Sequence, residues 1–269
     1  MTARRMSDSL IIPSIANGVG TITLNRPEVF NVLNLAMARQ FLHVLAQFDR
    51  DDAVRAIVLR GSGRVFSAGG DVREMLGHAR GGEDRAAYFR APLSAFGEMI
   101  LAVRSSPKPV LAAVHGAVAG VAFNLMLACD LKIAAQATRF TQAFIKIGLS
   151  PDGGGSWFLP RLVGYTRACE LALLPTELDA RTAREWGLIN WVVAGGDLER
   201  ETDRVATRLA QGPRSALARA KALLNGAYDR SLADHIEAER LAQVENADAP
   251  DFDEGLTAFL EKRPPRFGG

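Results

Sequence analysis

The sequence predicts an α/β fold in which short strands alternate with helices and a mainly helical segment follows. Up to Gly155, short apolar runs bounded by turn residues alternate with longer stretches of helical apolar spacing, which is typical of an α/β core. From Ser156 onward the pattern is almost wholly helical. The chain therefore changes from strand-rich to helix-rich near Gly155, and it contains no internal repeat or low-complexity segment.

The strand-rich part begins with a predicted hairpin. Residues 10–15 and 19–24 are apolar runs that flank Asn17-Gly18, a dipeptide typical of hairpin turns. Apolar residues at helical spacing predict a helix over 35–50. The remaining elements expected up to Gly155 are a strand over 56–59, a helix opening at Asp71, a mobile loop over 78–85, a helix over 86–103, a strand over 110–114, a helix after Gly120 and a strand over 131–134.

The helix-rich part carries apolar residues at a helical period in several stretches. Helices are predicted over 161–174, 180–186, 198–211, 214–228 and 232–246.

The composition is that of a globular protein with no dominant charge. The 269 residues can bury a large core and could form one large domain or two. Because 32 basic residues stand against 30 acidic ones, no global field favours nucleic acid or a membrane. Cys129 and Cys169 lie in apolar surroundings and are expected to be buried free thiols, and the four histidines show no metal-ligand spacing. No long apolar run follows the N-terminus, so we expect a cytoplasmic protein.

Two glycine-containing helix entrances are the most informative feature. The run Arg64-Val-Phe-Ser-Ala-Gly-Gly-Asp71 leads from a strand into a helix, and a second such entrance lies within 115–130, around Gly120-Val121. The first N–H groups of a helix lack internal partners and favour a negative charge. Two separate entrances can therefore supply two converging N–H donors, which is the minimum for an oxyanion hole.

Together with three further motifs, these entrances resemble the crotonase, or enoyl-CoA hydratase/isomerase, superfamily over nearly the whole chain. The further motifs are the N-terminal CoA-contacting segment at 24–34, the run Pro151-Asp-Gly-Gly-Gly155 and the tail Glu261-Lys-Arg-Pro-Pro-Arg-Phe267. The resemblance implies a spiral of ββα units with the active site over 1–200 and a helical C-terminal oligomerisation region over 201–269. It also implies a homotrimer or a dimer of trimers.

The resemblance also implies an acyl-CoA thioester substrate, in which coenzyme A is part of the substrate, with no metal or redox cofactor. The backbone N–H groups of Gly70 and Val121 would hold the thioester carbonyl as the oxyanion hole. The side chain at Val121 does not matter for an N–H donor. The alternative for Gly70 is that it only serves a tight turn.

Both glutamates of the family's hydratases are absent at the matching positions. Asn124 lies about one helical turn after Val121, where hydratases carry a glutamate, and an amide can orient a group but cannot act as acid or base. Phe144 occupies the position of the second glutamate, and a phenyl ring cannot activate water. For Asn124, a buried polar residue bonded to a neighbouring carbonyl is an equally good interpretation.

Asp152 is the remaining candidate for acid–base chemistry. Several isomerases of the superfamily carry an aspartate at the matching position, among them dienoyl-CoA isomerases and the ring-epoxide isomerase of phenylacetate breakdown, which the stretch 146–161 resembles most. An apolar pocket would raise its pKa and make it a usable base. The alternative is a helix cap or a turn aspartate. 4-Chlorobenzoyl-CoA dehalogenase uses a nearby aspartate as nucleophile, but its aromatic and histidine partners find no match here.

The matched motifs also supply candidate substrate contacts, although for Asp71 a helix cap is favoured over a substrate contact. The candidate substrate-binding residues are Arg26, Val29, Phe30, Val32, Ser67, Ala68, Asp71, Val72, Gly120, Asn124, Phe144, Phe259 and Lys262. In the family, a tail phenylalanine and lysine help to bind the CoA nucleotide, often that of the neighbouring subunit. A solvated basic C-terminus is the alternative for Phe259 and Lys262.

The sequence thus predicts an enoyl-CoA isomerase that shifts a double bond, or opens a ring epoxide, with one aspartate as acid and base. The first alternative is an enoyl-CoA hydratase. The second, from another class, is a catalytically silent CoA-binding homologue.

Overall fold

A six-stranded sheet forms the centre of the protein, in a computed structural model that describes residues 9–81 and 84–268. The strands lie in the order β1-β2-β3-β4-β6-β9, and all neighbours are parallel except β1 and β2, which form the predicted antiparallel hairpin. Their bounds are β1 Ile11–Ala16, β2 Val19–Leu24, β3 Ala56–Gly61, β4 Val110–Val114, β6 Leu131–Ala135 and β9 Trp191–Val193.

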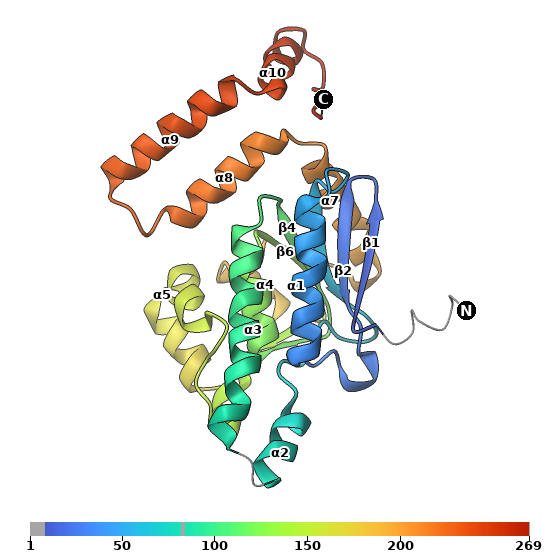
Figure 1. Cartoon of the computed structure of the whole chain (residues 1–269), viewed down its shortest axis with the longest axis vertical. Coiled ribbons are helices and arrows are strands. Elements are labelled where there is room, and N and C mark those ends of the chain that lie inside the picture. The colour runs from blue at the N-terminus through green and yellow to red at the C-terminus, as the bar shows by residue number, and fades with distance from the viewer. Residues whose placement is uncertain (1–8, 82–83, 269) are drawn as a thin grey trace, which may run out of the picture.

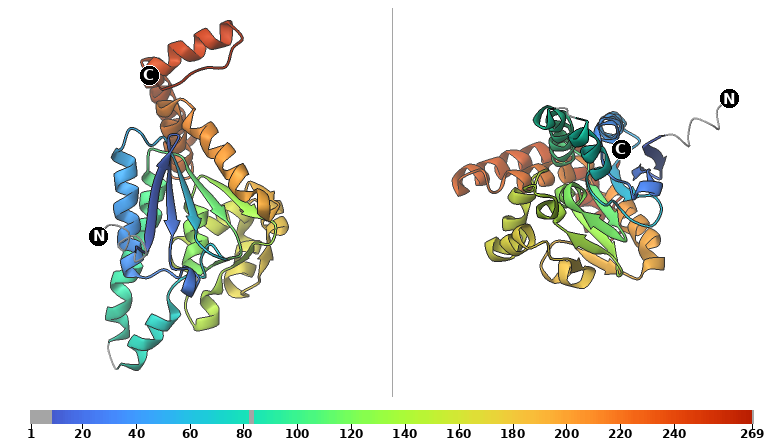
Figure 2. Two further views of the ribbon diagram at one scale, coloured as in Figure 1. Left: turned by 90° about the vertical axis from the view of Figure 1, so that its right-hand side faces the viewer. Right: turned by 90° about the horizontal axis from the view of Figure 1, so that it is seen from below.

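Helices cover both faces of this sheet (Figures 1 and 2). Helices α1 (Leu35–Arg50), α3 (Arg85–Ser105) and α4 (Gly120–Ala128) pack on one face, and α7 (Leu198–Ala210) packs on the other. In β3, Ile57 and Leu59 point into the larger core and Val58 into the smaller one, as expected for a parallel strand buried on both sides. The predicted α/β class is therefore confirmed.

A second, three-stranded sheet stands beside the first and joins the two helix entrances to the helix-rich part of the chain. It consists of β5 (Ala117–Ala119), β7 (Arg139–Thr141) and β8 (Leu178–Asp179), in the order β5-β7-β8. The 3-10 helix η3 (Ala143–Ile147) follows β7 directly. These strands have two or three residues each, so they carry no period that could have predicted them.

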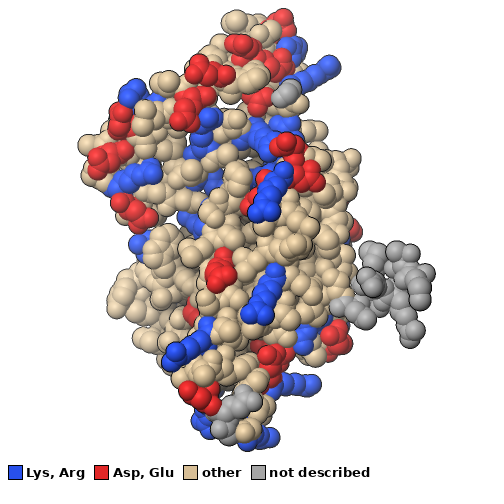
Figure 3. Space-filling model, in the orientation of Figure 1, with Lys and Arg blue, Asp and Glu red and all other residues tan. Residues whose placement is uncertain are grey.

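The C-terminal helices α8, α9 and α10 lie together at one end of the sheet (Figure 1). The helices after η3 are α5 Gly155–Leu173, α6 Ala180–Glu185, α7, α8 Arg214–Gly226, α9 Leu232–Ala247 and α10 Pro250–Leu260. The predicted division at residue 200 falls inside α7, which packs on β3 and β4. Acidic and basic side chains are interspersed over the face shown in Figure 3, in line with the balanced composition.

Several predicted boundaries change in the structure. Asp71 caps α2 (Val72–Arg80), so the predicted loop over 78–85 is wrong at its start, and residues 82–83 of it lie outside the described residues. Helix α5 begins at Gly155, ahead of the predicted residue 161, and is broken at Gly164 by a φ of 77°. Helix α10 was not predicted. Among the described helices, none combines the length and apolar character that a membrane span needs.

The two cysteines are free thiols, as predicted. Cys129 is buried, and its burial raises the pKa of the thiol to about 12, so it stays protonated and unreactive at neutral pH. Cys169 is only partly buried.

Candidate active site

A short backbone bridge brings the two glycine-containing helix entrances together. The Ser67 N–H donates to the Ala117 carbonyl at 3.1 Å, and the Ala119 N–H donates to the Ser67 carbonyl at 3.1 Å. The backbones that follow approach so closely that a Cβ on Gly69 would lie 2.9 Å from the Ala119 oxygen, and Gly69 has a φ of 97°. A larger residue at Gly69 would therefore push the two entrances apart.

Beyond this bridge, two backbone N–H groups are left without acceptors. Leu33 forms hydrogen bonds with the residues on either side of Gly70. Its N–H donates to the Gly69 carbonyl, and its carbonyl accepts the Asp71 N–H. Val121 lies in the first turn of α4, whose N-terminus has no side-chain cap. Within the described chain, neither the Gly70 nor the Val121 N–H has a hydrogen-bond acceptor. Both residues line the same cavity, so the predicted pair of donors is brought together.

Hydrogen bonds from Asn31 stabilise the loop of the first helix entrance. Its side-chain amide donates to the carbonyls of Ser62, Val65 and Phe66 at 2.8–3.1 Å, and its own carbonyl accepts the Ser67 hydroxyl at 2.7 Å. Asn31 is fully buried and has a φ of 52°, which asparagine tolerates better than most residues. The sequence analysis missed it, although it stands in the matched segment between Phe30 and Val32.

Arg26 and Asp71 form an ion pair at the mouth of this loop. The guanidinium of Arg26 donates to the Asp71 carboxylate at 3.0 Å and to the Val32 carbonyl at 3.0 Å. The other carboxylate oxygen of Asp71 caps α2 by accepting the Glu74 N–H. Asp71 is therefore a structural cap, the role that the sequence favoured, and Arg26 ties the predicted CoA segment to the start of α2.

The cavity in front of the two N–H groups has a volume of about 210 Å³ and is mainly apolar. Helices α2 and α3 form one wall, and η3 with the loop after it forms the other. Asp152 is the one carboxylate among the described residues that line it. The lining residues are Ala68, Gly69, Gly70, Val72, Met75, Phe89, Phe96, Gly120, Val121, Ala143, Phe144, Lys146, Ile147, Leu149 and Asp152.

Two side-chain amides fix the backbone of Asp152. The Asn124 amide donates to the Asp152 carbonyl at 2.8 Å, and the Asn124 oxygen accepts from the Gln142 amide at 2.7 Å. Asn124 and Gln142 are fully buried. A Cβ on Gly155 would lie 2.6 Å from the Asn124 nitrogen, so this contact requires glycine. The chain of amides runs from η3 through α4 to the Asp152 loop.

The Asp152 carboxyl group is poorly solvated. Its Oδ1 is buried and has no hydrogen-bond partner within the described chain. Burial raises the pKa of this carboxyl from 3.8 to about 6. A carboxylic acid with a pKa near the working pH can give and take a proton readily, which suits a general acid–base group.

The cavity contains seven of the predicted site residues: Gly70, Val121, Asp152, Ala68, Val72, Gly120 and Phe144. Ser67 and Asn124 are corrected from substrate contacts to structural residues, since both are fully buried and bonded within the protein. Arg26, Val29, Val32 and Asp71 belong to the loop beside the cavity but do not line it.

Three other predicted substrate-binding residues lie outside the cavity. Phe30 is half exposed, with the Arg64 guanidinium 5.5 Å from its ring. Phe259 and Lys262 lie at the end of α10, far from α2 in the same chain, and Phe259 is 81% exposed. A single chain therefore does not bring the tail to the cavity.

The sequence analysis also missed one wall of the cavity. Met75 on α2 and Phe89 and Phe96 on α3 line it together with Leu149. The two phenylalanines are seven residues apart on one face of α3, a spacing that does not distinguish a pocket from a core. Within residues 9–81 and 84–268, no cluster of histidine, cysteine and acidic side chains could hold a metal ion.

The Asp152→Asn variant is expected to be more stable than the wild type above pH 6. The folded pKa of Asp152 lies above its ordinary value, so the native state binds an additional proton between about pH 4 and pH 6, and stability falls as pH rises through this window. Removal of the charge should recover up to about 3 kcal/mol at pH 8 and nothing at pH 4.

Urea denaturation at both pH values measures this difference. The control is Asp229→Asn, which removes an exposed carboxylate. Equal stability of wild type and Asp152→Asn at pH 8 would show that the carboxylate is well solvated.

Comparisons with known proteins agree with this geometry. The family model described as Enoyl-CoA hydratase/isomerase matches residues 14–269. A protein from Rhodobacter capsulatus named "Probable enoyl-CoA hydratase" is 42% identical over 264 residues, which cover 98% of this chain and all of the relative. The 1,2-epoxyphenylacetyl-CoA isomerase of Escherichia coli is 39% identical and covers 96% of this chain and 98% of its own length.

Solved structures show the same fold. The crystal structure of an enoyl-CoA hydratase from a Polaromonas species superposes with a TM-score of 0.91 at 34% identity, and the match covers 96% of this chain and 99% of that one. The resemblance predicted from five motifs is thereby confirmed. With its full-length family match, its fold and its paired helix entrances, the chain belongs to the enoyl-CoA hydratase/isomerase family, the crotonase superfamily.

Proposed function

We propose that this protein is an acyl-CoA isomerase in which Asp152 is the sole acid–base group. One observation carries the proposal: the cavity in front of the Gly70 and Val121 N–H groups contains a single carboxylate among its described lining residues. An isomerase needs one such group, since the proton that it removes from one carbon is returned to another. The general activity of the family, chemistry on acyl-CoA thioesters, is common to the isomerase and the hydratase candidates.

The first step follows from the two free N–H groups. A thioester carbonyl bound between Gly70 and Val121 has its oxygen polarised by two donors, and both hydrogen bonds strengthen when negative charge develops on that oxygen. The α-proton, or the γ-proton of an α,β-unsaturated thioester, then becomes acidic enough to remove. The Asp152 carboxylate accepts the proton, the C–H electrons form the enolate, and the carbonyl oxygen carries the charge.

The second step returns the same proton. The protonated Asp152 delivers it to the other end of the conjugated system, the enolate collapses and the double bond is shifted by one position. For a ring epoxide, the same oxyanion contacts would stabilise charge while the ring opens. The raised pKa supports both roles, because the carboxyl is close to half-protonated near pH 6.

Hydration is the less favoured reaction at this site. Hydratases of the family carry two glutamates, but here Phe144 fills one position with an apolar ring that lines the cavity. Asn124 fills the other, and both ends of its amide are engaged with Asp152 and Gln142. Asp152 would have to orient and deprotonate water alone. The name of the Rhodobacter capsulatus relative keeps hydration as the alternative to be tested.

The acyl group is expected to be apolar. Phe89, Phe96, Met75 and Leu149 form its surroundings, and the volume of about 210 Å³ suits a short chain or a single ring. Lys146 is the one cation among the described lining residues. A cytoplasmic location is part of this proposal and rests on the sequence alone.

The Asp152→Asn variant should lose most of its isomerase turnover while its affinity for an acyl-CoA ligand stays within about twofold. The amide keeps the shape of the side chain and both N–H donors but cannot carry a proton, so a loss of roughly 10²–10⁴-fold in kcat is expected. Steady-state kinetics with a 3-enoyl-CoA, together with calorimetric binding of the product, measure the two effects. Asp229→Asn serves as the control and should retain full activity. A kcat of Asp152→Asn near that of wild type would refute the assignment.

Crotonyl-CoA should bind but be hydrated slowly. Without a carboxylate pair to hold and deprotonate water, hydration loses about 10²–10⁴-fold per missing group, whereas binding depends on the oxyanion donors, which remain. The ratio of kcat/KM for isomerisation of a 3-enoyl-CoA or a ring-epoxide thioester to that for crotonyl-CoA hydration should exceed one on a single preparation. Faster hydration would favour the hydratase. No turnover with either substrate, despite binding, would favour the silent CoA-binding homologue.

The protein should be a homo-oligomer, most simply a trimer or a pair of trimers. Helices α8 to α10 expose large apolar side chains, and Phe259 and Lys262 reach the CoA site only if a second chain supplies them. The exposed apolar residues are Leu224, Tyr228, Leu232, Ile236, Leu241, Val244, Phe252, Leu256, Phe259 and Leu260. Sedimentation at micromolar concentration should give a multiple of 29.0 kDa. A monomer would contradict this part of the proposal.

A further inference from the structure

A second cavity, of about 360 Å³, lies at the end of α4 opposite to Val121. It is bounded by the end of α3, the start of α5 and one face of α8, and it shares no lining residue with the catalytic cavity. Arg104, Lys132, Arg161 and Lys221 line it, and Asp130 is the one carboxylate among the described lining residues. The cavity therefore collects four cations and one anion.

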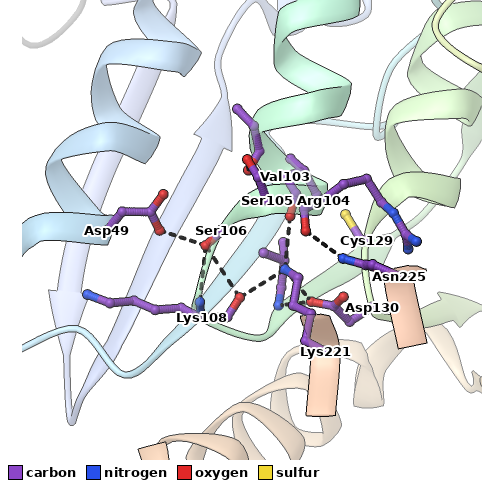
Figure 4. A network of polar contacts seen from close by, with 12 residues as sticks. Asp49, Val103, Arg104, Ser105, Ser106, Lys108, Cys129, Asp130, Lys221 and Asn225 are labelled. Carbon is purple, nitrogen blue, oxygen red and sulfur yellow. Dashed lines mark hydrogen bonds and ion pairs between the residues drawn. The ribbon is translucent and has the colours of Figure 1, made fainter. Parts of the chain in front are cut away.

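Two buried lysines of this region are fully satisfied by the protein. The Lys221 ammonium contacts the Asp130 carboxylate at 2.8 Å and donates to the carbonyls of Val103 and Lys108 at 2.9 and 3.1 Å (Figure 4). The Lys108 ammonium points away from the cavity and donates to the carbonyls of Phe48 and Asp51. The same Asp130 oxygen, Oδ2, also accepts the Val110 N–H at 2.7 Å.

Of the other cavity cations, Arg161 donates to the Trp157 carbonyl, whereas the charged groups of Lys132 and Arg104 have no acceptor within the described chain. Lys132 is 9% exposed, and its ammonium has no hydrogen-bond acceptor within residues 9–81 and 84–268. The Arg104 guanidinium also lacks an acceptor there, and no hydrogen bond or ion pair is drawn to it in Figure 4. Burial lowers the pKa of both groups, and the Arg104 charge lowers that of Lys132 further, whereas the Asp130 carboxylate partly offsets both effects. An anion between them would relieve both penalties.

An aromatic wall faces these cations. The Arg104 guanidinium lies 5.9 Å from the ring centre of Trp157 and 5.8 Å from that of Phe158. Arg161 covers the Trp157 ring at 4.0 Å. The remaining walls include Leu127 and Leu162, so the space beside the cations is apolar. Concave, mainly apolar cavities with a few converging charged groups are typical of small-molecule sites.

We propose that this second cavity binds a small organic anion, a carboxylate or phosphate ester carried on a flat apolar body. The anionic group lies between Lys132 and Arg104, where it supplies the acceptor that both cations lack. The guanidinium binds two oxygens of such a group side by side, and the ammonium adds a third contact. The flat body packs against Trp157 and Phe158.

The test uses benzoate and phenyl phosphate as probes and benzyl alcohol as the uncharged match, each titrated calorimetrically into wild-type protein. Both the carboxylate and the phosphate arm support the proposal if binding is at least about tenfold tighter than that of the alcohol, and their order identifies the preferred group. Lys132→Met should weaken anion binding by at least about tenfold. Arg208→Gln, which removes an exposed cation from α7, should not change it. Saturating crotonyl-CoA should not displace the probe.

Three results would overturn the proposal. The first is equal affinity for benzoate, phenyl phosphate and benzyl alcohol, and the second is unchanged anion binding by Lys132→Met. The third is a change of oligomeric state in Lys132→Met, which would mean that an acidic group of a second copy fills the cavity.

A stability measurement separates binding from folding. Because the Lys132 ammonium has no hydrogen-bond acceptor among the described residues, Lys132→Met should melt at the wild-type Tm or above it in a buffer free of carboxylate and phosphate. A clearly lower Tm under these conditions would show that Lys132 serves the fold, and it would also overturn the proposal.

Discussion

The backbone bridge between Ser67 and Val118 is the contact on which the candidate active site depends. Each helix entrance could exist without the other, but only this bridge places the Gly70 and Val121 N–H groups on one cavity. The bridge needs glycine at position 69, where the two backbones nearly touch, and it needs Asn31 beneath it, whose amide satisfies three loop carbonyls at once. The two N–H donors are therefore backbone groups placed by the fold, and the side chain at Val121 is not needed for its N–H to donate.

In the proposed isomerase, the fold supports acid–base chemistry by Asp152 alone. The amide chain Gln142–Asn124 holds the Asp152 backbone, while Phe144 and its apolar neighbours remove water from the carboxyl group. In the proposed isomerase, an amide and a ring at the positions of the two hydratase glutamates therefore change more than the number of acids. The Asn124 amide supports the backbone of Asp152. The Phe144 ring belongs to the apolar lining of the cavity in which burial raises the pKa of the Asp152 carboxyl.

Much of the fold and of the candidate site could be predicted from the sequence, and there are physical reasons why the other parts could not. Helix α1 was predicted at its observed bounds because its apolar period and the Asn34 cap agree. Strand β9 completes the sheet with three residues only, so its existence depends on pairing with β6 rather than on its own pattern. Phe89 and Phe96 could not be assigned to the cavity because their helical spacing indicates burial but not what covers them. Asn124 lies one turn after Val121 as predicted but does not line the cavity, because its amide bonds the carbonyl of Asp152, 28 residues later in the chain.

Each of the two cavities is lined by charged groups that lack a hydrogen-bond partner in the described chain, and the charge is negative in one cavity and positive in the other. In the candidate catalytic cavity, Asp152 Oδ1 has no hydrogen-bond partner within the described chain, and burial raises the pKa of its carboxyl to about 6, which suits the proposed acid–base role. In the second cavity the groups without an acceptor in the described chain are cations, Lys132 and Arg104, and neither lines the cavity of Asp152, Gly70 and Val121. Lys221 and Lys108 show that the same region can satisfy a buried ammonium with carbonyls and a carboxylate when the fold alone requires it. Lys132 and Arg104 lack such acceptors within the described chain, and the proposed anion would supply one to both.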